Sequence, residues 1–377
     1  MKKKIVSILV CAAMVVVLAA GCGSNSNSGG GNAAPTGDGS AATEAPAGDD
    51  AQAAEAVDTS NAEVTLRVQS HDPEQSATGT FLNAWAADVE AASNGRIDIE
   101  VYHGGTLGGP KDTLDMLRNG TCDIGWGLQS FFPDTFPVTE VFMLPNVGIT
   151  EAPIGSQAIW DFYNSTDYMD AEYSEFHVLL LHTNCQSPIT TVGKKVEKVS
   201  ELQGMDMRGN AGPPNMFIEA FGGQPQSCPI NDLYQNLNNN VYAGCITDWH
   251  GISAFKINEV SNGNIYFMDE NVGLSTYYMM INQNVYDGLP DDLKKILDDT
   301  TAEAIKYTSA WNDVEAAIKA TAEEAGQIYK LSDEERANLD AIEQQVVDQW
   351  IAGMNDKGYD GQAIYDKAME CIANAQK

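Results

Sequence analysis

Strand and helix patterns alternate along the chain from Val64 onward, and this alternation constrains the fold more than any other feature. Residues 64–69 alternate apolar and polar side chains with a period of two, as a half-buried strand does. Phe81, Trp85 and Val89 then recur every four residues, which places them on one face of a helix. The strand pattern returns at 97–101, so the segment begins with a strand, a helix and a second strand.

The same order continues through a second helix and a third strand. Pro110 opens the helical pattern, Asn119 and Gly120 close it, and residues 122–127 form an apolar strand. A chain that alternates in this way forms a parallel sheet with right-handed crossovers. We therefore expect an α/β fold whose ligand site lies at the carboxyl ends of the strands.

The second half of the chain repeats these patterns and adds a long helical segment. Further strands are expected at 177–182, 205–208, 245–247 and 274–282. After Pro290 a helical pattern continues for about forty residues, which at about 1.5 Å per residue is long enough to connect two lobes. Ser332 and Glu335 have the spacing of a capping box, and Gly361 precedes a last helix.

The first residues have the features of an export signal. Residues 1–21 combine Lys2 to Lys4 with an apolar run at 5–20 that is too short to span a bilayer comfortably. Small residues stand directly before Cys22, as in the lipobox of bacterial lipoproteins, so we expect Cys22 to be acylated after cleavage. An ordinary signal peptide followed by a coincidental cysteine is the alternative.

The next segment, 22–63, is expected to be a flexible, lipid-anchored linker. It is rich in Gly, Ser, Asn, Ala and Pro and lacks an apolar face that could be buried. Together with the leader it predicts an extracytoplasmic protein that reaches the membrane through its lipid anchor only.

Charge and cysteine content exclude some classes of protein. The formal net charge is −32, from 21 basic and 53 acidic residues, which argues strongly against nucleic acid as a partner because phosphate contacts need clustered Lys and Arg. Five cysteines remain beyond Cys22, an odd number without a CxxC spacing. We expect buried free thiols, and a single bridge between Cys228 and Cys245 stays open.

Catalytic, cofactor and metal motifs are absent from the sequence. There is no GxSxG, HExxH, GxGxxG or GxxxxGK[ST] segment. His177 and His182 are five residues apart, so they face opposite sides of one strand and cannot easily share a metal. We therefore expect neither an enzyme nor a resident cofactor or metal.

Four segments resemble successive motifs of one protein family. Residues 108–126, 192–210, 221–244 and 274–297 are similar, in this order, to segments of the solute-binding proteins of tripartite ATP-independent (TRAP) transporters. The likeness covers nearly all of the chain after residue 63. The chain is thus identified as a member of the DctP family, in a lipoprotein form.

The resemblance implies a fold, a function and partners. The fold is the two-lobed, periplasmic-binding-protein-like α/β fold of the class II type, in which each lobe is a mixed sheet flanked by helices and a long helix bridges the lobes. The lobes would comprise 64–188 plus 276–312 and 189–275 plus 313–377. Such a protein binds a small organic acid anion, a carboxylate, in the cleft and delivers it to the small and large permease subunits. A lipoprotein of an ABC importer is the alternative.

Arg208 is the main candidate for ligand binding. It matches the substrate-binding arginine of the family, and a planar guanidinium can hold a carboxylate with two parallel hydrogen bonds. Arg208 lies at the end of a short strand, directly before Gly209 and Asn210, which is a position at the edge of a cleft. A surface ion pair is the alternative role.

Further candidates follow or end other strands: His71, Trp126, Gln129, Trp249, His250 and Asn282. For Trp126 and Trp249, core packing is an equal alternative, and for His71 an exposed loop.

Overall fold

The computed structural model describes residues 57–377, in which the strands form two sheets. The first sheet has five strands in the order β2-β1-β3-β10-β4, and β1, β2 and β3 are parallel, as the alternation of patterns predicts. β10 pairs antiparallel with both β3 and β4, so the sheet is mixed. The strands are β1 (Val64–Gln69), β2 (Ile97–Tyr102), β3 (Ile124–Leu128), β4 (Phe176–Gln186) and β10 (Leu274–Asn282).

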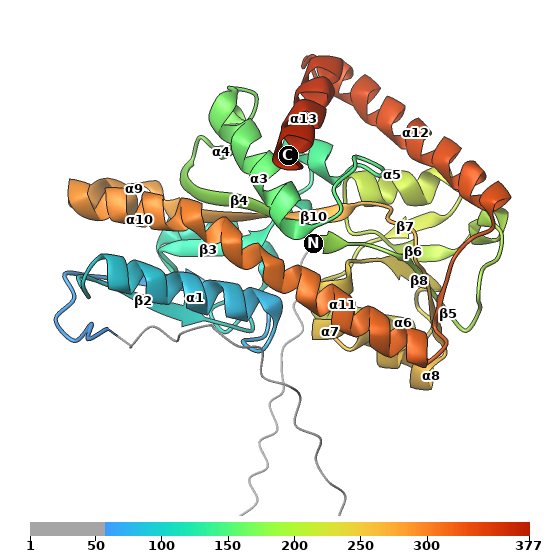
Figure 1. The fold of residues 1–377 in the computed structure, drawn as a ribbon, viewed down its shortest axis with the longest axis horizontal. Coiled ribbons are helices and arrows are strands. Elements are labelled where there is room, and N and C mark those ends of the chain that lie inside the picture. Colours follow the sequence, from blue (N-terminus) through green and yellow to red (C-terminus); the bar gives the residue numbers. More distant parts are fainter. Residues whose placement is uncertain (1–56) are drawn as a thin grey trace, which may run out of the picture. The chain divides into compact units, whose positions relative to one another are not determined.

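Helices pack against the first sheet (Figure 1). Ser76 caps the first of them by accepting a hydrogen bond from the Gly79 backbone, and Phe81, Trp85 and Val89 are fully buried along its inner face. Gly120, with a φ of 72°, ends the second helix in the left-handed conformation that glycine adopts without strain. These helices are α1 (Ala77–Ala92), α2 (Thr113–Asn119), α3 (Ala152–Ser165), α4 (Asp170–Tyr173), α9 (Gln283–Gly288) and α10 (Asp291–Glu303).

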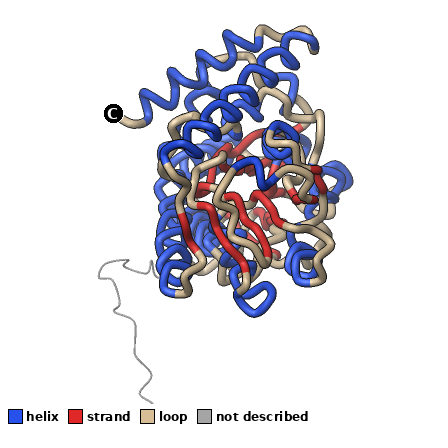
Figure 2. Tube along the Cα trace, turned by 90° about the vertical axis from the view of Figure 1, so that its right-hand side faces the viewer, coloured by secondary structure: helices blue, strands red, loops and turns tan. Residues whose placement is uncertain are grey.

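The second sheet has six short strands in the order β11-β9-β5-β8-β6-β7. Figure 2 shows strands in red with helices around them. β6 is parallel to β7 and β8, while β5 is antiparallel to β8 and β9. The strands are β5 (Ile189–Val192), β6 (Asp206–Arg208), β7 (Gln224–Gln226), β8 (Gly244–Ile246), β9 (Ile265–Met268) and β11 (Ile328–Tyr329). The helices connecting them are α5 (Pro213–Ala220), α6 (Ile230–Asn238), α7 (Trp249–Ala254) and α8 (Val260–Gly263).

The long helical segment after Pro290 is interrupted and shorter than expected. A 3₁₀ turn at Ala304–Thr308 separates α10 from α11 (Ser309–Glu324). The helix ends before Gly326, whose φ is 69°, and the chain then enters β11. α11 nevertheless contacts elements of both sheets, because it packs against α1 and β4 on one side and against α7 and β11 on the other. The expected bridging role of this segment therefore belongs to α11.

The last two helices contact different parts of the fold. Ser332 caps α12 (Asp333–Asp356) by accepting a hydrogen bond from the Glu335 backbone, which confirms that helix start. α12 packs against α5, whereas α13 (Gly361–Ala375) packs against α3 beside the first sheet (Figure 1). The lobe boundaries given above remain a prediction.

The structure also tests the expectations about the cysteines and about membrane-spanning helices. The five cysteines of the described residues are all free and buried, so the open alternative of a bridge between Cys228 and Cys245 is not formed. No helix within residues 57–377 has the length and apolar character needed to cross a bilayer. The leader, Cys22 and the linker as far as residue 56 lie outside the described residues.

Candidate functional site

A cavity lies where the carboxyl ends of parallel strands from the two sheets face each other. It contains about 620 Å³ of space that protein atoms do not fill, part of it open to solvent. The first sheet contributes the residues after β1 and β3 and the first residues of β10, which is antiparallel and therefore begins at this edge. The second sheet contributes the residues after β6 and β8. This is the position that the alternating pattern predicts for a ligand.

Apolar side chains from both sheets cover much of the wall of the cavity. The aromatic members are Phe131, Phe255 and Tyr277, and aliphatic side chains fill the spaces between them. These are Leu128, Met143, Ile230, Ile246, Val272 and Leu274. A wall of this kind removes water from the apolar part of a ligand, so that a few polar groups can determine its orientation.

Arg208 lies in this cavity with much of its hydrogen-bonding capacity unused. Its side chain is buried, and the residue is only 5% exposed. Nε donates to the Cys228 carbonyl over 3.4 Å and Nη1 donates to Thr247 Oγ1 over 3.3 Å, both long bonds. A guanidinium carries more N–H groups than these two bonds use. The remaining donors are available to an anion in the cavity.

The other arginines of the chain are all paired with carboxylates. Arg67 lies 2.9 Å from Asp123, and the remaining three form ion pairs of similar length. Those three are Arg96 with Glu63 and Asp292, Arg118 with Asp115 and Glu175, and Arg336 with Glu270, Asp340 and Glu343. Within residues 57–377, Arg208 has no such partner, although it is the most buried arginine. The expected alternative of a surface ion pair does not describe it.

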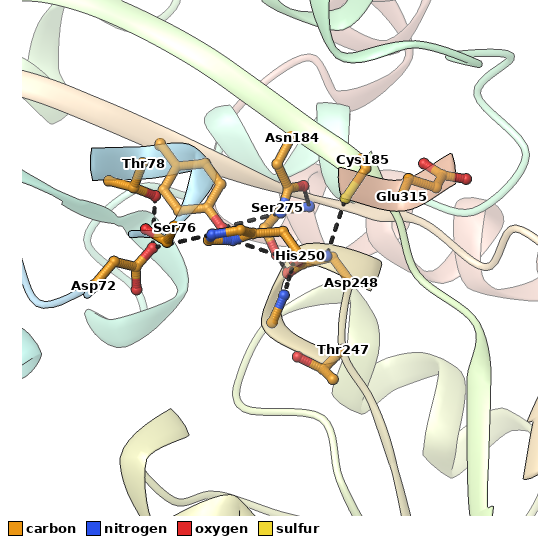
Figure 3. Close-up of polar contacts among 12 residues, drawn as sticks. Asp72, Ser76, Thr78, Asn184, Cys185, Thr247, Asp248, His250, Ser275 and Glu315 are labelled. Atoms are coloured by element: carbon orange, nitrogen blue, oxygen red, sulfur yellow. Dashed lines mark hydrogen bonds and ion pairs between the residues drawn. The ribbon is translucent and has the colours of Figure 1, made fainter. Parts of the chain in front are cut away.

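Four further polar side chains of the cavity form what we call the histidine cluster: His71, Asp72, Asp248 and His250. His71 Nε2 lies 3.4 Å from Asp72 Oδ1, and His250 Nε2 lies 3.8 Å from Asp72 Oδ2. His250 Nδ1 lies 3.9 Å from Asp248 Oδ1, so His250 stands between the two carboxylates (Figure 3). Burial lowers the pKa of His71, which favours the neutral imidazole at neutral pH.

Both carboxylates of the histidine cluster are fixed by neutral donors. Asp72 accepts a hydrogen bond of 2.6 Å from the Thr78 hydroxyl. Asp248 accepts from the Gly251 backbone over 2.8 Å and from the Ser275 hydroxyl over 3.2 Å (Figure 3). Neither carboxylate forms an ion pair with Lys or Arg in the described part of the chain, so the charge of this end of the cavity is negative.

Hydrogen bonds across the cavity join the two sheets. Asn210, after β6, donates to the Ser130 hydroxyl over 3.1 Å, and Ser275, on β10, donates to Asp248 after β8. The His250 backbone also lies 3.3 Å from the Cys185 sulfur at the end of β4 (Figure 3). The structure therefore has its two cavity walls in contact, as a closed binding protein would.

Of the seven candidate residues of the folded part, three line the cavity: His71, Arg208 and His250. Trp126 shares a strand face with Leu128 but lies deeper, where it stacks on Tyr277 at 4.7 Å and donates to His182 Nε2 over 2.9 Å. Trp126 therefore belongs to an aromatic stack behind the wall.

Gln129, Trp249 and Asn282 also lie outside the lining. Gln129 is buried and donates to the Tyr173 hydroxyl over 3.1 Å. Trp249 precedes His250 in the first turn of α7, where successive side chains point about 100° apart, and it packs on Phe267. Asn282 ends β10, and because β10 is antiparallel to β3 this end lies at the opposite edge of the sheet. Its side chain there caps α9.

Several lining residues were not among the candidates from the sequence. Asp72 and Asp248 each adjoin or nearly adjoin a candidate, and a polar residue directly after a strand is the signal that could have identified them. Ser275 and Tyr277 lie at the start of β10, and only the antiparallel direction of that strand brings them to the cavity.

Comparison with protein families identifies the chain. The model of the bacterial extracellular solute-binding proteins, family 7 (DctP), matches residues 68–353. The chain belongs to this family. Solute-binding proteins of the TRAP type are extracytoplasmic, bind small organic ligands and work with membrane permease subunits. The family assignment therefore favours a TRAP transporter over the ABC importer alternative.

Relatives within the family bind different ligands. The C4-dicarboxylate-binding protein DctB of Bacillus subtilis is 26% identical over 279 residues, which are 70% of this chain and 75% of that protein. The ectoine/5-hydroxyectoine-binding periplasmic protein UehA of Ruegeria pomeroyi is 23% identical over 288 residues, which are 74% and 83% of the two chains.

Solved structures share the fold over nearly the whole described part. A TRAP solute-binding protein of an unidentified marine microbe, specific for aromatic acid ligands and bound to 3-hydroxybenzoate, is 26% identical with a TM-score of 0.77, and the match covers 84% of this chain and 100% of that one. A TRAP solute-binding protein of Rhodoferax ferrireducens bound to benzoate is 25% identical with a TM-score of 0.76, covering 83% and 98%. These matches confirm the two-lobed α/β fold.

Proposed function

We propose that this protein binds a small organic acid through its carboxylate, in the cavity between the two sheets, and delivers the acid to the membrane subunits of a TRAP transporter without chemical change. The observation that carries the proposal is Arg208, a buried guanidinium without a carboxylate partner in residues 57–377. Leaving a buried charge unpaired is costly, so a site of this kind is suited to an anion that arrives from outside.

The apolar wall points to an acid with an apolar body. Phe131, Phe255 and Tyr277 surround the cavity together with aliphatic side chains, and Arg208 is the single arginine among the lining residues. Two related proteins of the same fold are bound to the aromatic acids 3-hydroxybenzoate and benzoate. We therefore propose aromatic carboxylates as the first ligands to test.

The test is a melting-temperature screen that pairs each acid with its primary amide. The amide keeps the shape of the acid and loses the negative charge, so only the acid should stabilise the protein. A ligand present at about one hundred times its Kd adds about 2.7 kcal/mol to the free energy of unfolding. Equal shifts with the acids and their amides would contradict carboxylate recognition.

We further propose that Cys22 carries the lipid anchor that holds the protein at the outer side of the cell membrane. The support is the basic, apolar and small-residue order of residues 1–22. Cys22→Ala should release the protein into the soluble extracytoplasmic fraction and leave ligand affinity unchanged. Retention of this variant in the membrane fraction would contradict the lipoprotein assignment, and Cys11→Ala, inside the leader, is the matched control that should stay anchored.

We also propose that closure joins the lobes expected from the resemblance, 64–188 plus 276–312 and 189–275 plus 313–377. Arg208 and the residues after β8 belong to one proposed lobe, and the residues after β1 and β3 belong to the other. A ligand that touches both lobes stabilises the closed form, because the open form offers it only half of these contacts.

A further inference from the structure

Two ring nitrogens of the histidine cluster, one on each histidine, lack a hydrogen-bond partner. His71 is 2% exposed and His250 is 3% exposed, and both line the cavity. In the structure, His71 Nδ1 and His250 Nε2 have no hydrogen-bond partner. Buried ring nitrogens are normally paired, so two unpaired ones at one cavity wall need an explanation.

Asp72 determines which groups the ring of His71 can offer. Its Oδ1 lies 3.4 Å from His71 Nε2, a close contact that does not form a hydrogen bond, and the negative charge of this carboxylate favours the neutral tautomer with its proton on Nε2. His71 Nδ1 then carries a lone pair and can only accept a hydrogen bond. The ring itself is held by stacking on Trp126 at 5.2 Å and by the edge of Phe131 at 5.5 Å, so it cannot turn away freely.

The charge around the cluster restricts what can occupy this end of the cavity. The groups that face the two histidines are the carboxylates of Asp72 and Asp248, and Arg208 forms no ion pair with either. A second carboxylate of a ligand would lie beside two negative charges and could not donate a hydrogen bond to His71 Nδ1. A hydroxyl group is neutral, donates one hydrogen bond and accepts others.

We infer that the preferred ligand is a monocarboxylate whose end opposite the carboxylate carries a hydroxyl group, and that the histidine cluster binds this hydroxyl and rejects a second carboxylate. The hydroxyl donates to His71 Nδ1 and completes a site that the protein leaves open. This inference rests on the proposed function, because it assumes that Arg208 takes the carboxylate.

The experiment is calorimetry on the full protein with two matched series of probes. The first series is benzoate, 3- and 4-hydroxybenzoate, and the corresponding benzene dicarboxylates. The second series repeats the comparison without a ring, with butanoate, 4-hydroxybutanoate and succinate. In the series that binds, a hydroxy acid should bind about tenfold to a hundredfold more tightly than the parent acid, and the dicarboxylates more weakly than the parent.

Two variants assign the preference to the cluster. His71→Phe keeps a ring on Trp126 and removes both nitrogens, so the hydroxy acid and the parent acid should bind equally. Asp72→Asn removes a negative charge and should weaken the rejection of the dicarboxylate. His177→Phe is the control, because His177 stacks on Tyr286 outside the cavity, and it should keep the preference of the wild type.

The outcomes separate the inference from the proposed function. Equal affinity for the parent and hydroxy acids, or a dicarboxylate that binds as tightly as the hydroxy acid, overturns the inference while carboxylate binding stands. Absence of binding by every acid in both series overturns the proposed carboxylate binding together with the inference. A hydroxyl preference that survives His71→Phe with the wild-type magnitude also overturns the inference.

Discussion

The cavity wall and the aromatic stack directly behind it both contain a buried histidine, but only the histidine of the stack has all of its hydrogen bonds. In the stack, His182 accepts a hydrogen bond from Trp126 Nε1 over 2.9 Å, and its Nδ1 donates to the Thr183 carbonyl over 3.1 Å. Tyr277 belongs to both regions, because it stacks on Trp126 and also lines the cavity, and its hydroxyl is paired with Asn184 Nδ2 at 3.0 Å. At the wall, His71 stacks on the same Trp126 but has an unpaired Nδ1.

This difference shows that burial alone does not distinguish a binding residue from a core residue. His71 and His182 are both almost completely buried, and burial lowers the pKa of both. They differ in whether the protein completes their hydrogen bonds. The same contrast separates Arg208 from the other four arginines, each of which has a carboxylate partner. Unused hydrogen-bonding capacity beside a cavity is therefore the better guide to the site.

The largest expected effect is the loss of ligand affinity when Arg208 in the cavity wall is replaced. Arg208→Ala should weaken binding of a carboxylate ligand by about 2 to 5 kcal/mol, which is roughly thirtyfold to several thousandfold, because the ligand loses its counter-charge in a dry site. Arg208→Lys keeps the charge without the planar fork, so its affinity should lie between those of the wild type and Arg208→Ala. Calorimetry with the best acid from the melting screen measures both.

Arg96→Ala is the matched control for Arg208. Arg96 is paired with Glu63 and Asp292 on the surface, so its loss should leave the affinity unchanged. The melting temperature without ligand should change little in the Arg208 variants, since Arg208 makes only two long hydrogen bonds to the protein. Wild-type affinity in Arg208→Ala would remove this residue from the binding site.

The second expected effect is a loss of stability at low pH, caused by His182 in the aromatic stack. Burial lowers the pKa of His182 to about 4 from an ordinary value of 6.5. Below pH 6.5 the unfolded chain therefore binds a proton at this histidine, whereas the folded protein binds it only near pH 4. The stability that is present above pH 6.5 is lost as the pH falls. Between pH 7 and pH 4.5 this one group should cost about 2 to 3 kcal/mol of the free energy of unfolding.

His182→Gln isolates this contribution, because glutamine does not titrate and can still accept from Trp126 and donate to Thr183. Denaturant unfolding at the two pH values should show a smaller loss of stability for the variant than for the wild type. Equal losses in the two proteins would mean that His182 is not the group that titrates. Affinity for the ligand at pH 7 should be similar in both, since His182 does not line the cavity.

The longer periodic segments were the predictable part of the fold. The alternation at 64–69 and the apolar run at 274–282 coincide with β1 and β10, and Phe81, Trp85 and Val89 form the buried face of α1. The strands β5, β7, β9 and β11 have two to four residues each and were not expected from the sequence. The equally short β6 and β8 were expected, so length alone does not decide, and the four that were missed are defined by their pairing with neighbouring strands.

The site was predictable only where strand ends mark it. His71 follows the parallel strand β1 and was expected at the cavity for that reason, whereas Arg208 ends the parallel strand β6 and was expected there mainly from the family resemblance. The contact of His250 with Asp72, by contrast, depends on how the two sheets meet, and no local pattern contains that information. The pairing state of each polar group, which separates His71 from His182, also requires the folded structure.

The smallest expected effect concerns Asn282, which was a candidate for the site and lies at the opposite sheet edge. Its side chain accepts hydrogen bonds from the backbones of Asn284 and Val285 and donates to the Leu117 carbonyl. Asn282→Ala should therefore lower the free energy of unfolding by about 1 kcal/mol, as the loss of a helix cap does, and leave ligand affinity unchanged. Asn282→Asp keeps the capping oxygen but cannot donate to the Leu117 carbonyl, so it should recover only part of the lost stability. Ligand affinity of Asn282→Ala is measured by calorimetry at a temperature where the variant stays folded. A clear fall in affinity would place part of the binding site at the sheet edge opposite the cavity. It would contradict the assignment of the cavity described above.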